Sequence, residues 1–368
     1  MRTSDFDFHL PDDLIAQAPP SARGDSRLMV LDRRTGATTC TTVAALPRLL
    51  RAGDLLVVND TRVFPARLLG HRVPSGGAVQ CLLLRRLDAE RWDALVHPGQ
   101  KLRVGERFVC EGAGGRLHAT ILERIGFGRR VIGLQAGDGA VDTIIDAIGH
   151  VPLPPYIKRP DTVADRDRYQ TVFARARGSV AAPTAGLHFT PALLQAIEAA
   201  GVERVAVTLH VGYGTFKPLR AERIEDHVVD DEEYEVSVDA ATRIDLALAE
   251  GRRVIAVGTT TTRALESAAL RAEADDGPGG VPRVAAGRRP SSLFIRPGHR
   301  FRVVSGLFTN FHVPRSSLLV LVSALAGRDR VLAAYEEAVM RRFPFFRTGG
   351  ASPTGFTPTP KPPNPNTL

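Results

Sequence analysis

A strand, helix, strand pattern near the middle of the chain constrains the fold most. Residues 179–182 predict a short buried strand, Thr190 and Pro191 predict the N-cap and first turn of a helix, and Gly201 predicts its end. Residues 205–210 predict a second strand. A unit of this length favours parallel pairing, and parallel sheets collect ligands at the carboxyl ends of their strands. We therefore predict an α/β fold with a site beside this unit.

Two histidines flank the predicted helix in loops of small residues. His188 follows the first strand, and His210 opens a glycine-rich loop after the second. One such histidine is more often structural than catalytic. Two of them at the same edge of a sheet, beside glycine and threonine loops, favour a site. Because the imidazole pKa lies near working pH, both are candidate acid–base groups.

A long β-rich region without helical patterns interrupts the α/β pattern. Six short runs follow one another with glycine or charged turns, at residues 66–73, 79–84, 92–96, 107–110, 117–124 and 130–134. That spacing predicts a small antiparallel barrel or sandwich. We predict a mixed, largely parallel α/β sheet with flanking helices, carrying this barrel as an insertion. The domains are 1–63 with 140–346 for the α/β part, 64–139 for the barrel, and 347–368 as a disordered tail.

Further strands and helices complete the predicted α/β domain. Apolar runs predict strands at 55–58 and 254–257, and helical periodicity predicts helices at 141–148, 263–274, 316–326 and 331–342. Between the strand 254–257 and the helix 263–274, residues 258–262 predict a loop. Its threonines can cap the helix while the exposed N–H groups bind an anion. The chain has no P-loop, no Gly-x-Gly-x-x-Gly after a strand and no Gly-x-Ser-x-Gly. Nucleotide triphosphatases, dinucleotide dehydrogenases and serine hydrolases are therefore not supported.

Composition adds expectations about location and oxidation state. The 368 residues are 43% hydrophobic and 24% charged, which is typical of a soluble globular protein. No apolar run approaches the ~20 residues that cross a bilayer, and the N-terminus lacks the apolar core of a signal peptide. We expect a cytoplasmic monomer without membrane contact. Cys40, Cys81 and Cys110 lie far apart, so we expect neither disulfides nor a metal site.

The net charge of +8 permits two interpretations. It suits a polyanionic partner such as nucleic acid, because each neutralised phosphate releases counterions. However, only four of the basic residues are lysines, and a GC-rich genome produces an arginine excess without any functional reason. The excess is also spread along the sequence rather than massed in one basic arm. Both interpretations stay open.

Several long motifs resemble one enzyme family, the S-adenosylmethionine:tRNA ribosyltransferase-isomerases of queuosine biosynthesis. The resemblance runs from about Asp5 to Phe346. It rests on NDTR at Asn59, GHVPLPPYIKR at Gly149, DRDRYQTVFA at Asp165, PTAGLHFT at Pro183, TLHVGYGTF at Thr208, VIAVGTTTTRALES at Val254 and TNFHVPRSS at Thr309.

The resemblance implies an α/β domain with an inserted β-barrel and a specific reaction. The ribosyl part of S-adenosylmethionine moves to 7-aminomethyl-7-deazaguanine at the wobble position of tRNA, and adenine and methionine leave as epoxyqueuosine forms. The partners implied are that tRNA and S-adenosylmethionine. Since S-adenosylmethionine is consumed as a substrate, no cofactor is expected.

This chemistry needs a base for an acidic ribose proton, a donor that assists the departure of adenine, and a carboxylate that offsets the sulfonium. The candidate catalytic residues are His188, His210, His227, Glu232 and His312. The candidate substrate-binding residues are Asn59, Asp60, Arg62, Thr184, Gly186, Gly212, Gly214, Thr215, Gly258, Thr259, Thr260, Arg263 and Asn310.

Roles within this set follow from residue type. Asp60 or Glu232 could offset the positive charge, and Arg62 or Arg263 could hold the methionine carboxylate through a bidentate pair. The glycines allow close approach of the backbone to the nucleoside. Two structural alternatives stay open: Asp60 and Arg62 could form an ion pair that fixes a turn, and His312 could bond a local carbonyl.

Three departures from the family pattern leave room for other functions. Asp230 stands where the family has a histidine in a Met-His-Ser-Glu run, and Tyr213 stands where the family has alanine. After Phe345 and Phe346 the family's Ser-Tyr-Gly-Asp-Ala-Met ending is absent. The alternatives are a relative that acts on a free deazapurine or another small acceptor, and a non-catalytic RNA-binding protein on the same scaffold.

Overall fold

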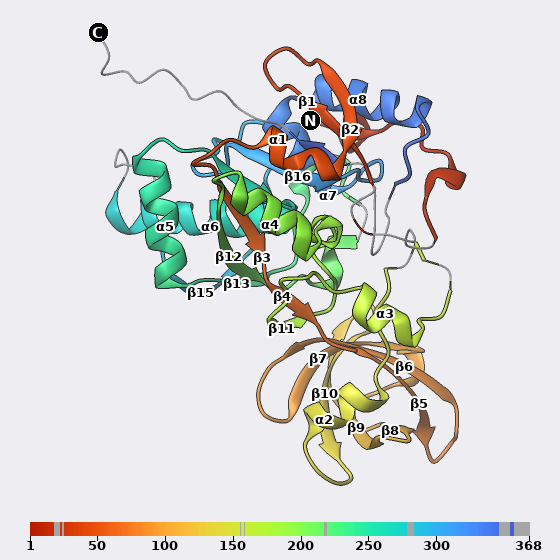
Figure 1. The fold of residues 1–368 in the computed structure, drawn as a ribbon. Helices are drawn as coiled ribbons and strands as arrows, with labels where there is room; N and C mark the ends of the chain where they lie inside the picture. The colour runs from red at the N-terminus through yellow and green to blue at the C-terminus, as the bar shows by residue number, and fades with distance from the viewer. Residues whose placement is uncertain are drawn as a thin grey trace. The chain divides into compact units, whose positions relative to one another are not determined.

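A computed structural model divides the chain into two compact units (Figure 1). Unit 1 comprises residues 1–61, 170–176 and 182–368, and unit 2 comprises residues 62–169 and 177–181. The residues that the structure describes are 1–17, 23, 26–154, 156–157, 159–216, 219–277, 283–345 and 354–356.

Unit 1 is built on a mixed sheet of nine strands with helices packed against it. The strand order is β15-β13-β12-β3-β14-β16-β17-β1-β2. At its centre β12, β3, β14 and β16 pair in parallel, while β13, β15 and β2 pair antiparallel at the two edges. The bounds are β1 (Arg27–Leu31), β2 (Thr38–Thr42), β3 (Leu55–Asn59), β12 (Glu203–Leu209), β13 (Glu232–Val236), β14 (Val254–Val257), β15 (Gly287–Ser291), β16 (Gly306–Asn310) and β17 (Thr354–Phe356).

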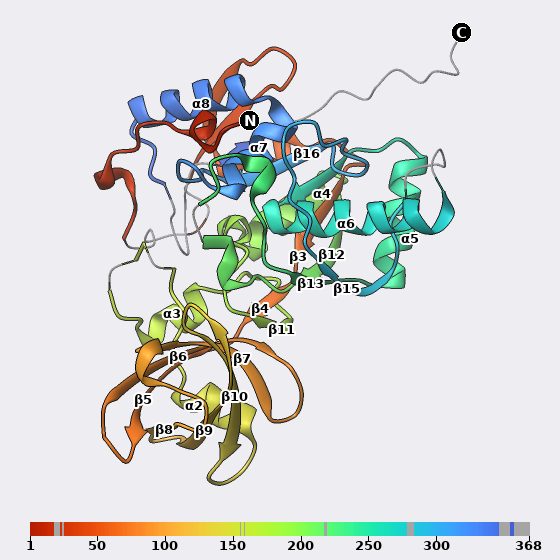
Figure 2. The same ribbon diagram turned by 180° about the vertical axis from the view of Figure 1, so that it is seen from behind.

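The helices of unit 1 cover this sheet, as the two opposite views show (Figures 1 and 2). The longest, α6, contacts β12, β13, β14, β15 and β16, and α5 contacts β12 and β14. The bounds are α1 (Leu46–Leu49), α4 (Pro191–Ala199), α5 (Val238–Ala249), α6 (Thr259–Asp276), α7 (Ser317–Ala326) and α8 (Arg328–Met340). The predicted fold class, a mixed α/β sheet with flanking helices and an antiparallel barrel, is confirmed.

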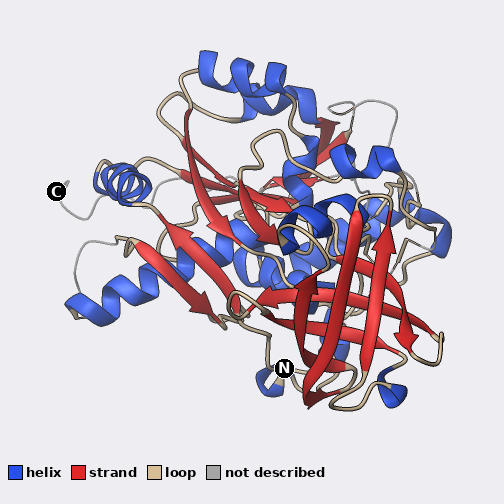
Figure 3. Cartoon of the chain, turned by 90° about the horizontal axis from the view of Figure 1, so that it is seen from below, coloured by secondary structure: helices blue, strands red, loops and turns tan. Residues whose placement is uncertain are grey.

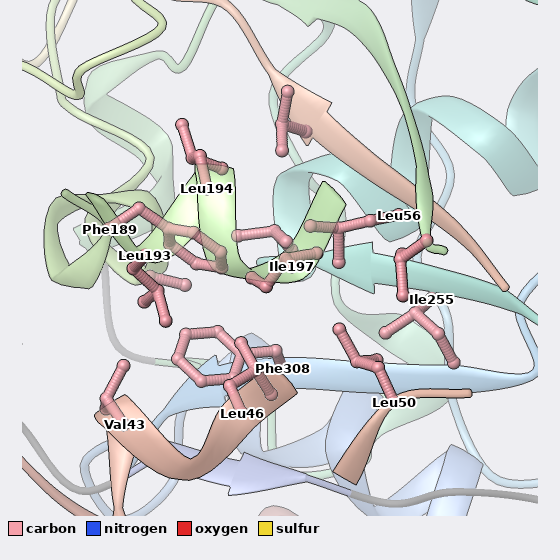
Figure 4. Close-up of a cluster of buried hydrophobic side chains, with 14 of the residues drawn as sticks. Val43, Leu46, Leu50, Leu56, Phe189, Leu193, Leu194, Ile197, Ile255 and Phe308 are labelled. Carbon is pink, nitrogen blue, oxygen red and sulfur yellow. The ribbon is translucent and has the colours of Figure 1, made fainter. Parts of the chain in front are cut away.

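Helix α4 shows how the local sequence builds the core. The Thr190 hydroxyl accepts a hydrogen bond from Leu193 N, Pro191 occupies the first helical position, and Gly201 follows the helix with φ +79°, so both predicted ends are confirmed. The apolar face of α4 carries Leu193, Leu194 and Ile197. Figure 4 shows these side chains in one buried cluster with residues of β3, β14 and β16. This cluster fixes α4 against the parallel centre of the sheet.

The pairing of the first predicted strand differs from expectation. A strand does precede the 3-10 helix Thr184–His188, but this strand is β11 (Ala176–Ser179). It pairs with β4 (Thr61–Val63) in a separate two-stranded sheet. Residues 180–182 form no strand, because the Ser179 hydroxyl donates to Ala181 O in a local turn. Consequently β12 has β3 as its parallel neighbour.

The threonine segment before α6 was also predicted wrongly as a loop. The helix begins at Thr259, and Gly258 is its N-cap with φ +93°, a value that L side chains rarely adopt. The hydroxyls of Thr261 and Thr262 donate back to Val257 O and Gly258 O instead of capping the helix. Threonine can satisfy its hydroxyl in this way inside a helix, which is why its presence did not mark a loop.

Unit 2 contains a closed antiparallel barrel with strand order β10-β7-β6-β5-β8-β9, drawn with its strands in red in Figure 3. All six β-rich runs predicted from the sequence lie in these strands. The bounds are β5 (Arg67–Val73), β6 (Ala78–Arg86), β7 (Arg91–His97), β8 (Arg107–Gly112), β9 (Gly115–Gly126) and β10 (Arg129–Ala136). Unit 2 also holds α2 (Val141–Ile148), which packs on β8, β9 and β10, and α3 (Val163–Arg168).

Three further expectations concern the tail, the membrane and metal ions. The tail predicted to be disordered, 347–368, lies outside the described residues except for 354–356, which form β17 between β16 and β1. Within the described ranges, no helix combines the length and the hydropathy needed to span a membrane. The same ranges contain no group of three potential metal ligands.

Candidate active site

A solvent-open pocket of about 590 Å³ lies in unit 1. Its walls come from the segment before β13, from α6, from the loop after β15 and from the start of α7. The lining residues are Gly214, His227, Val228, Val229, Asp230, Glu232, Arg263, Leu293, Phe294, Ile295, Ser317, Leu318 and Leu321. The mixture of apolar walls with a few charged groups is typical of a small-molecule site.

A buried ion pair forms one wall of this pocket. Glu232, at the start of β13, is only 4% exposed. Its Oε1 accepts a hydrogen bond from Gly212 N at 2.8 Å, and its Oε2 accepts from Arg263 Nη1. Arg263 also donates from Nε to Leu293 O at 3.1 Å. The charge of each partner is therefore largely offset by the other, and the pair with its two backbone contacts ties four segments together.

His227 and Asp230 supply the titratable groups next to this pair. The His227 ring stacks edge-on against Phe294 with 5.1 Å between centroids. Burial lowers the pKa of His227, and the charge of Asp230 acts in the opposite direction. His227 is thus neutral at neutral pH and can accept a proton. A Cβ on Gly214 would lie 2.4 Å from Asp230 Oδ2, so any larger residue there would displace the Asp230 side chain.

His210 lies at the carboxyl end of β12 but does not line this pocket. Its Nδ1 is 2.8 Å from the Thr61 hydroxyl, and its backbone N donates to Glu233 O. Burial lowers its pKa, and the Glu233 charge opposes that shift. The half-buried ring is thus held in one orientation by the hydroxyl of Thr61 at the start of β4.

The other two histidines are deep in the fold. His188 is fully buried, with Nδ1 3.2 Å from the Ser26 hydroxyl and Nε2 2.9 Å from Asn310 Oδ1. Because Asn310 Oδ1 can only accept, Nε2 donates and Nδ1 accepts in this arrangement. His312 is 3.1 Å from the Thr309 hydroxyl, and burial lowers its pKa to about 3. Its local partner is a hydroxyl, not the carbonyl considered from the sequence.

The NDTR motif has a structural network around it. The Asn59 amide donates to Leu209 O and to the Thr260 hydroxyl, and its oxygen accepts from the N–H groups of Thr61 and Leu209. The Asn59 side chain therefore ties β3 to β12 and α6. Both its amide nitrogen and its oxygen are engaged in these hydrogen bonds. Asp60 next to it accepts from Thr208 and forms an ion pair with Arg175.

Of the structural alternatives left open by the sequence, the ion pair between Asp60 and Arg62 does not form, because Asp60 pairs with another arginine. Arg175 takes that place at 2.9 Å, because the segment 170–176 returns to unit 1. Arg62 itself belongs to unit 2 and is exposed. The structure thus gives this motif a role in linking strands.

The remaining candidates surround these groups. Gly186 packs against Phe173 and Thr171, where an added Cβ would come within 2.8 Å of each, so its need for glycine comes from packing. Thr184 begins the 3-10 helix Thr184–His188. Thr259 is buried at the start of α6. Thr215 lies in the 3-10 turn Tyr213–Phe216, and its side chain is outside the described residues.

Sequence reasoning found four of the pocket residues, namely Gly214, His227, Glu232 and Arg263, and missed most of the walls. The missed walls are Val228, Val229, Leu293, Phe294, Ile295, Ser317, Leu318 and Leu321. Apolar residues in a loop and at a helix start give no signal that separates a ligand wall from ordinary core. Asp230 did carry a signal, because it departs from the family pattern.

Comparison with known proteins identifies the family. A family model described as "Queuosine biosynthesis protein" matches residues 3–352. The chain belongs to this family. A Halothermothrix orenii protein named S-adenosylmethionine:tRNA ribosyltransferase-isomerase is 47% identical, over 95% of this chain and 99% of that protein. A Citrifermentans bemidjiense protein of the same name is 50% identical over the same shares.

A solved structure agrees with these relatives. The crystal structure of S-adenosylmethionine tRNA ribosyltransferase from Thermotoga maritima is 34% identical, with a TM-score of 0.52 over 96% of this chain and 100% of that one. The family resemblance inferred from motifs is confirmed, and so is the prediction that the chain is an enzyme of queuosine biosynthesis.

Proposed function

We propose that this enzyme moves the ribosyl part of S-adenosylmethionine onto 7-aminomethyl-7-deazaguanine at the wobble position of tRNA and isomerises it. The product is epoxyqueuosine in tRNA, with release of adenine and methionine. The observation that carries the proposal is the pocket, which combines a neutral histidine, His227, with a carboxylate, Asp230, in the chain of a family whose relatives bear this name.

The pocket groups suit the proposed substrate as follows. Glu232 pairs with Arg263, and Asp230 brings a second carboxylate to the same pocket, where carboxylates attract a sulfonium cation. Phe294 adds an aromatic face, which attracts cations. His227 accepts the acidic ribose proton. Arg263 positions Glu232 in this scheme and does not hold the methionine carboxylate, since its Nη1 and Nε are already engaged.

We assign supporting roles to the other histidines. His210 is the second acid–base candidate. Its Nδ1 is hydrogen-bonded to a side chain, whereas its Nε2 has no such partner within the described residues, so Nε2 is the atom that can exchange a proton. His188 and His312 position the strands and turns around the site. Asn59 and Asp60 do the same for the ends of β3 and β12.

The test is an assay for free adenine. The protein is incubated with S-adenosylmethionine and tRNA carrying 7-aminomethyl-7-deazaguanine, with a chelator present, because no cofactor or metal is proposed. Adenine should appear only with that tRNA. Adenine release with the free deazapurine alone would favour a small acceptor. No release with either acceptor would contradict the proposal and favour a non-catalytic RNA-binding protein.

Two histidine variants assign the roles. His227→Ala should slow adenine release by ~10²- to 10⁴-fold with an unchanged melting temperature. His188→Ala should instead lower the free energy of unfolding by about 3 kcal/mol, because it leaves a cavity and two unpaired polar partners. A stable, inactive His188→Ala variant beside a fully active His227→Ala variant would reverse this assignment.

A further inference from the structure

The turn between β9 and β10 carries an aromatic residue that the fold does not need. Phe127 is 103% exposed, so its ring buries no surface. Its φ is +45°, in the left-handed region that favours glycine or asparagine over bulky side chains. Gly126 and Gly128 flank it. Neither burial nor backbone preference explains a phenylalanine at this position, which makes a binding role worth testing.

The turn is held firmly on the barrel. Arg130 is buried and donates from Nε to Leu102 O at 3.1 Å and from Nη2 to Gly99 O at 2.5 Å. Arg129 forms a bidentate ion pair with Asp93, and Gly128 O accepts from Val96 N. These contacts fix the base of the turn, so the Phe127 ring is presented on a rigid support.

The surroundings of this ring are basic. Lys101 and Arg124 are exposed on the segments next to the turn, and the charge of Arg124 acts on Arg130. Unit 2 as a whole contains 18 lysines and arginines against 12 aspartates and glutamates, whereas unit 1 has 30 against 28. The excess of positive charge is therefore concentrated in unit 2, and the even spread inferred from the sequence was wrong.

We infer that the β9–β10 turn binds RNA by stacking Phe127 on an unpaired base, while Arg124 and Lys101 contact neighbouring phosphates. RNA loops are recognised mainly through such stacking and through phosphate contacts, and every base offers a face for it. An exposed aromatic ring in a basic unit matches that chemistry better than it matches a protein surface. The inference rests on the proposed function, which brings a tRNA loop to this enzyme.

The experiment measures tRNA affinity by fluorescence anisotropy and S-adenosylmethionine affinity by calorimetry on the intact protein. Phe127→Ala and Phe127→Gly should each weaken tRNA binding by about tenfold or more, whereas Phe127→Trp should bind tRNA as tightly as the parent protein. Glycine tolerates the positive φ, so that variant separates lost stacking from backbone strain. The matched control is Ile125→Ala, which removes another exposed apolar side chain of the same hairpin and should change nothing. Affinity for S-adenosylmethionine should stay constant throughout.

The outcomes separate this inference from the proposed function. If Phe127→Ala and Phe127→Gly bind tRNA as tightly as the parent, the inference is overturned and the ring belongs to another class of partner. That result leaves adenine release intact. If the parent binds tRNA through Phe127 but releases no adenine, the proposed function fails while the inference stands.

Discussion

At the residue scale, we expect Asp230 to contribute to the binding of a cationic ligand in the pocket that it lines. Asp230→Asn removes the carboxylate with little change in shape, so affinity for S-adenosylmethionine should fall by about tenfold, the effect of losing one partly screened ion pair. Affinity for S-adenosylhomocysteine, a neutral thioether, should hold. Calorimetry with both ligands measures the difference. Asp231→Asn is the control, because Asp231 is exposed and does not line the pocket. Equal losses for the two ligands would show that Asp230 does not bind the sulfonium.

His312 makes stability depend on pH at the same scale. Its pKa is about 3 in the folded protein and 6.5 in the unfolded chain, so between these values the unfolded state binds more protons. The contribution is complete above pH 6.5 and is lost as the pH falls. Between pH 6.5 and 5 the loss should be about 2 kcal/mol. Urea unfolding at both pH values measures it, and His312→Gln should show a smaller loss. An identical loss in the variant would assign the effect to other groups.

At the element scale, the glycine-rich loop after β12 offers a matched pair of substitutions. A Cβ at Gly214 would overlap Asp230 Oδ2 at 2.4 Å, whereas a Cβ at Gly212 would make ordinary contact with Glu232 Oε1 at 3.5 Å. Gly214→Ala should therefore displace Asp230 and reduce kcat/KM by about tenfold or more, a loss of ~1.4 kcal/mol in transition-state binding. Gly212→Ala should keep most activity. If steady-state adenine release ranked the two variants in the opposite order, the position of Asp230 would not limit catalysis.

The secondary-structure elements also show which parts of the fold could be predicted from the sequence. The barrel strands and α4 were predictable because their signals are local: alternation, turns, an N-cap and a terminal glycine. The pairing of β11 with β4 was not, since nothing in either strand specifies its partner. The buried environment of His188 was hidden for the same reason, because Ser26 and Asn310 are far away in sequence.

At the scale of the whole molecule, the charge of unit 2 predicts a strong salt dependence of tRNA binding. The logarithm of the binding constant should fall linearly with the logarithm of salt concentration, with a slope of about −0.7 to −0.9 for each neutralised phosphate. Replacing Lys101 and Arg124 by glutamine should make that slope shallower. Replacing Arg328 and Arg341 of unit 1 should not, since unit 1 is nearly neutral. Anisotropy titrations at several salt concentrations give the slopes, and a slope unaffected by the unit 2 changes would exclude these phosphate contacts.

The route of the chain between the units limits how the barrel can be transplanted. Residues 170–176 leave unit 2, enter unit 1 and return, and there Phe173 packs on Phe189 and Arg175 pairs with Asp60. A chimaera that exchanged residues 62–181 as one cassette would remove both side chains from the recipient. Grafting a foreign barrel onto this enzyme therefore needs two splice sites on its exit side, with the native 170–176 kept between them.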